Sequence, residues 1–310
     1  MGSKQATRES YGKALAELAK ENKNVVVLDA DLSKSTKTAD FKAVAPERFF
    51  NMGIAEANMM GVAAGMSTCG KIPFVSTFAM FAAGRAFEQI RNSICYPKLN
   101  VKICATHAGL TVGEDGATHQ AIEDISLMRS IPNMTVINPA DDVETIAAIK
   151  AVAKMEGPCY VRLGRMAVER VNDPDKYKFE IGKGVKLADG KDVTIIATGI
   201  MVEAALEAKK ILKDKNIDAR IINIHTIKPI DKDIIVEAAK ETGLIVTAEE
   251  HSIIGGLGSA VAEVVSEEYP VKVLRVGVKD TFGESGKPAE LLKKYGLTAE
   301  DIANKVVNNL

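Results

Sequence analysis

Glu56 is the only charged residue in the stretch MGIAEANMMGVAAGM, which spans residues 52–66. The composition of this stretch predicts a buried helix that begins near the glutamate. A buried carboxylate loses its hydration, so it must find a partner or take up a proton. We therefore interpret Glu56 as a residue with a chemical role. The simpler alternative is a helix-start residue that the helix dipole favours.

A second group with chemical potential is the loop AGLTVGEDGAT, residues 108–118, which two histidines bracket. The loop holds three glycines and two acids, and His107 and His119 are two of the four histidines in the chain. Two histidines around such a segment at the end of a strand indicate a functional loop. Neither histidine has a second histidine at helical i, i+4 spacing, so we expect no metal site.

The elements that must position these residues alternate between helical and strand-like periodicity. Continuous Val and Ile runs separated by helices predict a parallel sheet that is covered on both faces. Helices are expected at residues 10–22, 53–70, 83–97, 119–132 and 141–157, and strands at 24–32, 72–78, 100–107, 134–140 and 158–164.

The pattern lapses in a charged, turn-rich segment and then resumes. We predict an α/β protein of two domains with mainly parallel sheets: residues 1–166, a linker at 167–190, and a smaller domain at 191–310. Ligands gather at the carboxyl ends of parallel strands. In the first domain these ends read DADLSKS, VSTF, ATHAGLTVGEDGATH and RLGR. The second domain has expected strands at 192–199, 219–227, 243–250 and 271–278.

The composition argues against a nucleic-acid-binding protein and against a membrane-spanning one. Lys and Arg number 40 against 41 Asp and Glu, with no long block of one sign, so no nucleic-acid footprint exists. No apolar run reaches the length that spans a membrane, and the four cysteines show no CxxC spacing. We expect a cytoplasmic protein with reduced thiols. The glycines of EEHSIIGGLGSAV are interpreted as a structural turn, and His225 and His251 as structural residues.

Residues 105–141, ATHAGLTVGEDGATHQAIEDISLMRSIPNMTVINPAD, closely resemble a transketolase pattern. In that pattern ATH at a strand end is followed by GEDGPTHQP and then by a strand of the form RSIPN…V..PAD. The segment GIAE resembles the glutamate motif shared by transketolase, 1-deoxyxylulose-5-phosphate synthase and the beta subunits of 2-oxo-acid dehydrogenases. The likeness covers essentially all 310 residues. It implies the pyrimidine-binding domain and the C-terminal domain of a transketolase.

The resemblance implies thiamine diphosphate as the cofactor. In the family, the glutamate matched by Glu56 donates a hydrogen bond to a ring nitrogen of the aminopyrimidine, a role that the expected burial favours. Phe78 should stack on the pyrimidine, with Phe81 and Val75 beside it, although transketolases often have an aromatic residue at the position of Val75. Two further positions match the family: Ile54, the bulky support of the bent cofactor, and Asp31, an acid near the cofactor and the subunit boundary.

Substrate recognition is implied in the same way. His107 resembles a phosphate-binding histidine, Asp115 an acid that contacts a sugar hydroxyl, and His119 a histidine near the carbonyl end of the donor. We expect His107 and His119, with the glutamate of GIAE, to be the catalytic residues. The residues that fall where the family binds the terminal sugar phosphate are Arg8, Ser35 and Arg165, and arginine suits a phosphate because it can donate two hydrogen bonds.

The resemblance also implies a partner. The GDG motif and the Asn-bearing segment with which the superfamily holds magnesium and the diphosphate do not occur in these 310 residues. The expected partner is therefore an N-terminal-half transketolase subunit that holds Mg²⁺ or another divalent cation. The expected assembly is of the α2β2 type. The implied reaction is ketol transfer from a ketose phosphate to an aldose phosphate, as in the pentose phosphate pathway, and the individual sugars stay open.

Three alternatives remain at this stage. A 1-deoxyxylulose-5-phosphate synthase shares GIAE and a GATHQ segment but is normally one long chain. A 2-oxo-acid dehydrogenase beta subunit is a separate chain of similar architecture, and its loop usually lacks GEDG. A non-catalytic assembly subunit could retain the fold, but it would not need Glu56 together with the two histidines of the loop.

Overall fold

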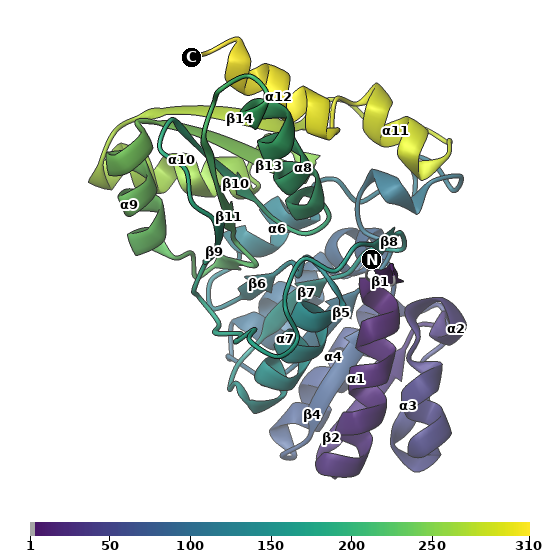
Figure 1. Cartoon of the computed structure of the whole chain (residues 1–310). Coiled ribbons are helices and arrows are strands. Elements are labelled where there is room, and N and C mark those ends of the chain that lie inside the picture. Colours follow the sequence, from purple (N-terminus) through teal and green to yellow (C-terminus); the bar gives the residue numbers. More distant parts are fainter. Residues whose placement is uncertain (1–3) are drawn as a thin grey trace.

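The computed structural model describes residues 4–310 and divides them between two α/β units (Figure 1). Each unit is built around its own sheet, and most neighbouring strands in both sheets are parallel. The predicted class, two α/β domains with mainly parallel sheets, is confirmed. In Figure 1 the second unit, green to yellow, lies above the first, purple to teal.

The first sheet has seven strands in the order β12-β6-β7-β5-β4-β2-β3. Its strands β2, β5 and β7 are buried along their whole length and contain many Val, Ile, Leu and Cys residues, because a parallel sheet buries both faces of each strand. Six of its strands come from the first part of the chain: β2 (Val25–Asp29), β3 (Phe49–Asn51), β4 (Ile72–Ser76), β5 (Lys102–Ala105), β6 (Thr135–Ile137) and β7 (Cys159–Arg162).

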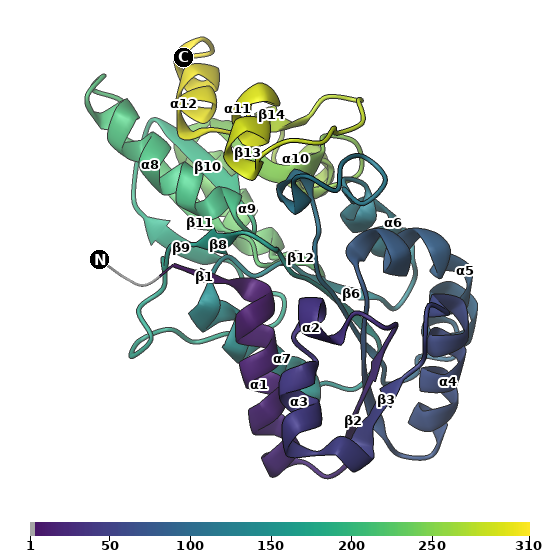
Figure 2. The ribbon, with the colours of Figure 1, turned by 90° about the vertical axis from the view of Figure 1, so that its right-hand side faces the viewer.

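Helices cover both faces of this sheet (Figure 2). One face carries α1 (Thr7–Glu21), α3 (Ala39–Val44) and α7 (Asp142–Lys154). The other carries α4 (Glu56–Thr68), α6 (Asp124–Ser130) and a segment in which π-helical turns at Phe81–Arg85 and Ile90–Cys95 flank α5 (Phe87–Gln89). The short α2 (Ser33–Thr36) follows β2.

The second sheet has five strands in the order β14-β13-β10-β11-β9, and only β9 is antiparallel to its neighbour. Helices α8 and α12 pack on one face, and α9 and α10 on the other. The elements are β9 (Val185–Ala188), β10 (Val193–Ala197), α8 (Met201–Lys213), β11 (Ala219–Asn223), α9 (Lys232–Thr242), β13 (Leu244–Ser252), α10 (Leu257–Glu268), β14 (Lys272–Val278), α11 (Pro288–Lys294) and α12 (Ala299–Val307).

Two features differ from the sequence-based expectation. The sequence predicts one strand over residues 219–227, but the chain leaves the second sheet after Asn223. The next strand, β12 (Thr226–Lys228), joins the edge of the first sheet antiparallel to β6.

The segment 167–190 is predicted as a linker, but it also contains strands. In it, β8 (Ala167–Val168) pairs with β1 (Gln5–Ala6), and β9 belongs to the second sheet. The two units are therefore linked by strand pairing as well as by the chain.

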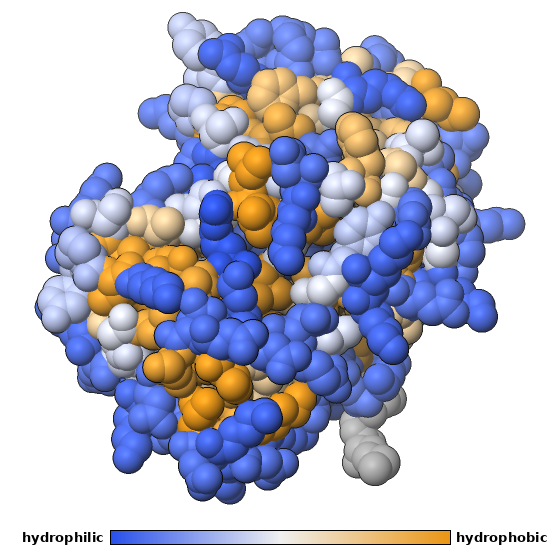
Figure 3. All heavy atoms as spheres, turned by 90° about the horizontal axis from the view of Figure 1, so that it is seen from above, coloured by the Kyte–Doolittle hydropathy of each residue, from blue (hydrophilic) through white to orange (hydrophobic). Residues whose placement is uncertain are grey.

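The surface mixes charged and apolar side chains, and Figure 3 shows apolar patches set among charged residues on the face seen from above. No helix of residues 4–310 combines the length and the apolar character that crossing a bilayer requires.

Candidate active site

The predicted site residues gather at the carboxyl ends of the first sheet. Phe78 follows β4, His107 follows β5 and Arg165 follows β7, while Arg8 lies in the first turn of α1. Strand ends of a parallel sheet meet at one edge, so residues far apart in the sequence become neighbours there. A bridge between Phe78 and Thr106 ties the ends of β4 and β5 together.

The two histidines of the loop converge on a pair of phenylalanines. The rings of Phe78 and His107 stack with centroids 3.9 Å apart. The rings of Phe81 and His119 meet edge to face with centroids 5.3 Å apart, and the two phenylalanine rings lie 5.9 Å apart. The loop thus returns its second histidine to the same aromatic pair as its first, and the four rings form one cluster.

His107 is held in an unusual state. Its backbone has φ of 56°, a left-handed conformation that is uncommon for a residue with a side chain. Its Nδ1 lies 2.9 Å from the Thr106 hydroxyl. The pKa of His107 is lowered to about 3, first by burial and then by the nearby positive charges of Arg8 and Arg165 and by His119. The imidazole is therefore neutral at physiological pH.

Two arginines give this edge a positive potential. Arg8 donates from Nη1 to the Ser35 carbonyl oxygen at 2.8 Å, while its buried Nε has no hydrogen-bond partner. Burial lowers the pKa of Arg8, and the charge of Arg165 acts in the same direction. Arg165 donates to the Val112 carbonyl oxygen and pairs with Glu114 at 3.0 Å. An unpaired buried donor beside a second arginine suits an anion such as a phosphate.

Glu56 has a partner that the sequence did not reveal. It is the first residue of α4 and is 1% exposed, and both its carboxylate oxygens accept from Arg85 Nη1 at 2.8 Å. The guanidinium carbon of Arg85 lies 4.5 Å from the centre of the Phe81 ring. Glu56 is thus joined through Arg85 and Phe81 to the cluster of rings. The dipole at the start of α4 also favours its charge.

Other predicted residues lie on exposed segments. Ile54 is 77% exposed beside the start of α4. Asp31 is exposed after β2 and accepts a hydrogen bond from Asn51 at 2.8 Å. Asp115 is exposed in the loop. Ser35 contributes its backbone oxygen to Arg8.

The expectation that Val75 lies beside the cofactor stays a prediction. Val75 lies inside β4, where it pairs with Leu28 and Ile103 on the two neighbouring strands, and it is fully buried. Its side chain belongs to the core between the sheet and α4. The structure therefore shows Val75 packed in this core, on the face of the sheet that α4 covers.

The described part of the chain, residues 4–310, contains no group of three or more His, Cys, Asp or Glu side chains able to hold a metal ion. His225 and His251 are fully buried, and burial lowers the pKa of each to about 4. His251 Nδ1 lies 2.7 Å from the Ser252 carbonyl oxygen, and its Nε2 accepts from the Ser126 N–H. These contacts suit the structural role expected for this histidine.

Comparison with known proteins identifies both units. Residues 3–170 match the family described as transketolase, pyrimidine binding domain, and residues 182–302 match transketolase, C-terminal domain. The chain is 56% identical over 305 residues to a putative transketolase C-terminal section of Methanocaldococcus jannaschii, covering 98% of this chain and 96% of that protein. It is 39% identical over 312 residues to the transketolase of Homo sapiens, of which it spans 49%.

A solved structure is similar along nearly the whole chain. It is described as a split gene transketolase, inactive beta4 tetramer, with a TM-score of 0.92 and 64% identity. The superposition covers 98% of this chain and 97% of that one.

Proposed function

Because the chain belongs to the transketolase family and corresponds to the C-terminal section of a split transketolase, we propose that it is one subunit of a ketol-transferring enzyme. The proposed reaction moves a two-carbon ketol unit from a ketose phosphate to an aldose phosphate. The observation that carries the proposal is the convergence of His107 and His119 on one aromatic pair at the strand ends, with the charges of Arg8 and Arg165 close enough to lower the pKa of His107. The family matches favour this reaction over those of the synthase and dehydrogenase alternatives.

The residues fit thiamine diphosphate as the cofactor. Phe78 and Phe81 offer aromatic faces for an aminopyrimidine ring, and the buried Glu56 lies within the same group of contacts. When bound, thiamine diphosphate supplies the electron sink for breaking a carbon–carbon bond. Glu56 would hold a hydrogen bond to the ring, and Ile54 and Asp31 would border the cofactor at the exposed rim of the site.

Arg85 matters for this proposal because it occupies the Glu56 carboxylate, which the cofactor ring would also need as a hydrogen-bond partner. Its side chain is 49% exposed, so it can turn toward solvent when another group takes its place at Glu56. The ion pair satisfies the buried Glu56 carboxylate while the chain is alone. Binding of the aminopyrimidine ring would then replace Arg85 as the hydrogen-bond partner of the Glu56 carboxyl group.

Substrate binding would fall to the positive end of the site. Arg8 and Arg165 would bind the terminal phosphate, with Ser35 holding Arg8 in place. His107, neutral and with Nδ1 engaged by Thr106, leaves Nε2 for a hydroxyl or phosphate oxygen of the sugar. His119 stands on the other side of the aromatic pair and would move a proton at the carbonyl end of the donor. Asp115 would contact a sugar hydroxyl.

A partner chain would complete the active site. We propose an N-terminal-half subunit that holds the diphosphate and Mg²⁺, in an α2β2 assembly. The similar split-gene protein is described as inactive when it forms a tetramer of beta chains, which supports this dependence. Self-association has a suitable surface on α4, where Gly61 and Gly65 face open space beside the exposed Ile54. Such small residues let a helix of a second copy approach closely.

Reconstitution tests the proposed function. The chain alone should show no ketol transfer from a ketose phosphate to an aldose phosphate. Addition of the N-terminal-half chain, thiamine diphosphate and Mg²⁺ should start the reaction. Turnover by the purified chain without a second polypeptide would refute the need for a partner. A complex of both chains that binds the cofactor but transfers no ketol unit would refute the reaction.

A further inference from the structure

The loop between the two histidines is packed into the second unit of the protein. Leu110 and Ile122, near its two ends, belong to the same hydrophobic cluster as the inner residues of β10 and β13. The 3₁₀ turn Leu110–Val112 also contacts α11. In Figure 1 this segment rises from the first unit toward α11. The second unit therefore helps to hold the loop in position.

Glu250 on β13 is the polar contact at the base of this loop. Its side chain is buried, and Oε1 accepts from the backbone N–H of Thr111 at 2.6 Å. Gly109 leaves the room that this contact needs: it has φ of 80°, and a Cβ there would lie 2.3 Å from the Glu250 carboxyl carbon. The carboxylate thus occupies the concave side of the turn that starts the loop.

The backbone of Glu250 is tied to the other end of the loop. Arg162 Nη2 donates to the Glu250 carbonyl oxygen at 3.0 Å and to the Ala121 carbonyl oxygen at 3.2 Å. Arg162 is itself fixed by Asp124, to which its Nε donates at 2.8 Å. The start of the loop therefore contacts the side chain of Glu250. The segment that follows the loop is connected to the backbone of Glu250 through Arg162.

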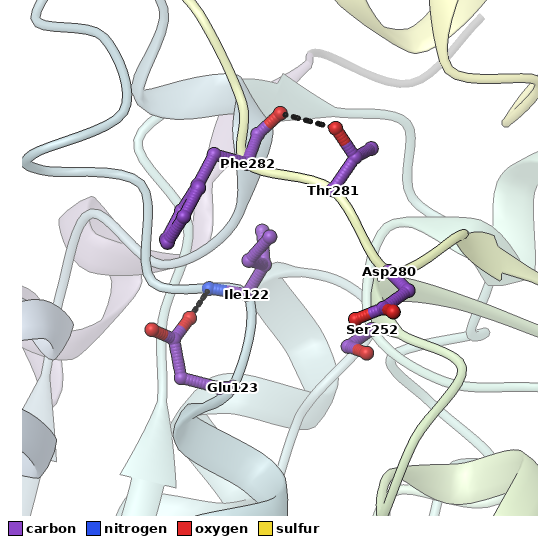
Figure 4. Close-up of a pocket in the computed structure, with 6 residues that line it drawn as sticks. All are labelled: Ile122, Glu123, Ser252, Asp280, Thr281 and Phe282. Carbon is purple, nitrogen blue, oxygen red and sulfur yellow. Dashed lines mark hydrogen bonds between the residues drawn. The ribbon is translucent and has the colours of Figure 1, made fainter.

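Further contacts hold the rest of the loop to the same unit. The Ser252 N–H donates to the Ile122 carbonyl oxygen at 2.7 Å, and the Ser285 hydroxyl donates to the Glu114 carbonyl oxygen at 2.7 Å. Beside them lies a cavity of about 210 Å³, where Ile122 and Glu123 face Ser252 and Phe282 (Figure 4). Most of these contacts border the loop, and Glu250 supplies the buried carboxyl group that contacts its backbone from the second unit.

We propose that Glu250 is a positioning residue for substrate binding: by anchoring the Thr111 amide, its carboxylate sets where His107 and His119 stand. The inference rests on the proposed function for its kinetic consequence. It assigns the second unit a part in the active site, although that unit contributes none of the predicted site residues. Glu250 acts through the loop and not by touching the substrate.

Glu249 provides a matched control on the same strand. It is as fully buried as Glu250, but its side chain points to the other face of β13. There it accepts from the Leu257 and Gly258 N–H groups at 2.7 and 2.8 Å, at the start of α10. Loss of either glutamate removes a buried acceptor, and only Glu250 contacts the loop through its carboxylate.

Hydrogen–deuterium exchange of the full chain, without a partner, tests the anchoring directly. Glu250→Ala should accelerate exchange in residues 108–121 about tenfold or more, because the hydrogen bond from the Thr111 N–H to a buried acceptor is lost. Glu249→Ala should accelerate exchange at the start of α10 and leave residues 108–121 unchanged. Glu250→Gln keeps an acceptor oxygen and should restore most of the protection. If Glu250→Ala does not fold, Glu250→Asp, which is too short to reach Thr111, replaces it.

Kinetics of the reconstituted complex provide the second measurement. Glu250→Ala should raise the KM for a ketose phosphate about tenfold or more relative to Glu249→Ala, and Glu250→Gln should return it toward the original value. Equal exchange in residues 108–121 for both alanine variants would overturn the inference, as would equal KM values. If the unmodified complex transfers no ketol unit, the proposed function fails, while the exchange experiment still decides the role of Glu250.

Discussion

Arg165→Ala should raise the KM for phosphorylated sugars strongly while kcat stays nearly unchanged. In the structure Arg165 lies beside His107 and Arg8, with its side chain 38% exposed at the mouth of the site. The contact it would make with a phosphate is a charge-assisted hydrogen bond. Such a bond contributes about 1.5–3 kcal/mol, which corresponds to an increase of roughly ten- to a hundredfold in KM.

The ion pair with Glu114 refines this expectation. Arg165 Nη1 already pairs with Glu114 Oε2 at 3.0 Å, so a phosphate must displace that carboxylate. The Glu114 side chain is 60% exposed, and ion pairs at the surface contribute little. The displacement therefore costs less than the phosphate contact gains. Glu114→Gln should lower the KM for a sugar phosphate slightly, opposite in sign to the effect of Arg165→Ala.

The assay is steady-state ketol transfer by the reconstituted complex with a ketose phosphate and with the same ketose lacking the phosphate. Arg165→Lys is the control that keeps the charge but removes the planar pair of donors. The effect of Arg165→Ala should be confined to the phosphorylated sugar. An equal rise in KM for both sugars would refute phosphate binding, and it would assign Arg165 to holding the loop through the Val112 carbonyl oxygen.

Two predictions concern buried groups. The pKa of His107 is about 3 in the folded chain and about 6.5 in the unfolded chain, so below pH 6.5 only the unfolded chain takes up this proton. Protonation of His107 in the unfolded chain should therefore subtract about 2 kcal/mol from the free energy of unfolding between pH 7.5 and pH 5. Other buried histidines and glutamates also change protonation in this range, so the test is the difference in free energy of unfolding between the unmodified chain and His107→Gln in denaturant titrations. This difference should fall by about 2 kcal/mol over the range, and a constant difference would contradict the lowered pKa. Arg162→Leu should reduce the free energy of unfolding by about 3–5 kcal/mol, because it leaves the buried Asp124 carboxylate without its ion-pair partner. A loss below about 1 kcal/mol in the same titration would contradict a stabilising role of the Arg162–Asp124 ion pair.

Much of the site could be predicted because the ends of buried strands can be recognised in a sequence. A Val- and Ile-rich run marks a buried parallel strand, and the polar residues that follow it must lie at one edge of the sheet. That reasoning brings Phe78, His107 and Arg165 together without knowledge of their contacts. The GEDG loop and GIAE then supply the family, which the comparisons confirm.

Other features depend on register and on contacts between the two units, which periodicity does not encode. Arg85 reaches Glu56 from a π-helical turn, where the usual spacing of helical neighbours does not apply. The sequence predicts one strand over residues 219–227, but the structure has two: β11 in the second sheet and β12, which pairs with β6 in the first sheet. Glu250 lies in an ordinary strand end of the second unit, and its contact with Thr111 joins residues 139 positions apart.

The proposal that this chain supplies the pyrimidine half of a shared active site is tested most directly by Glu56→Gln. Glutamine keeps the shape of the side chain and can still accept from Arg85, so the fold and the melting temperature should be nearly unchanged. It cannot offer an acidic proton to the cofactor ring. In the complex reconstituted with the N-terminal-half chain, thiamine diphosphate and Mg²⁺, kcat for ketol transfer should fall by about 10²–10⁴-fold. A variant that turns over as fast as the unmodified complex while its melting temperature drops would make Glu56 a structural helix-start residue and contradict the account.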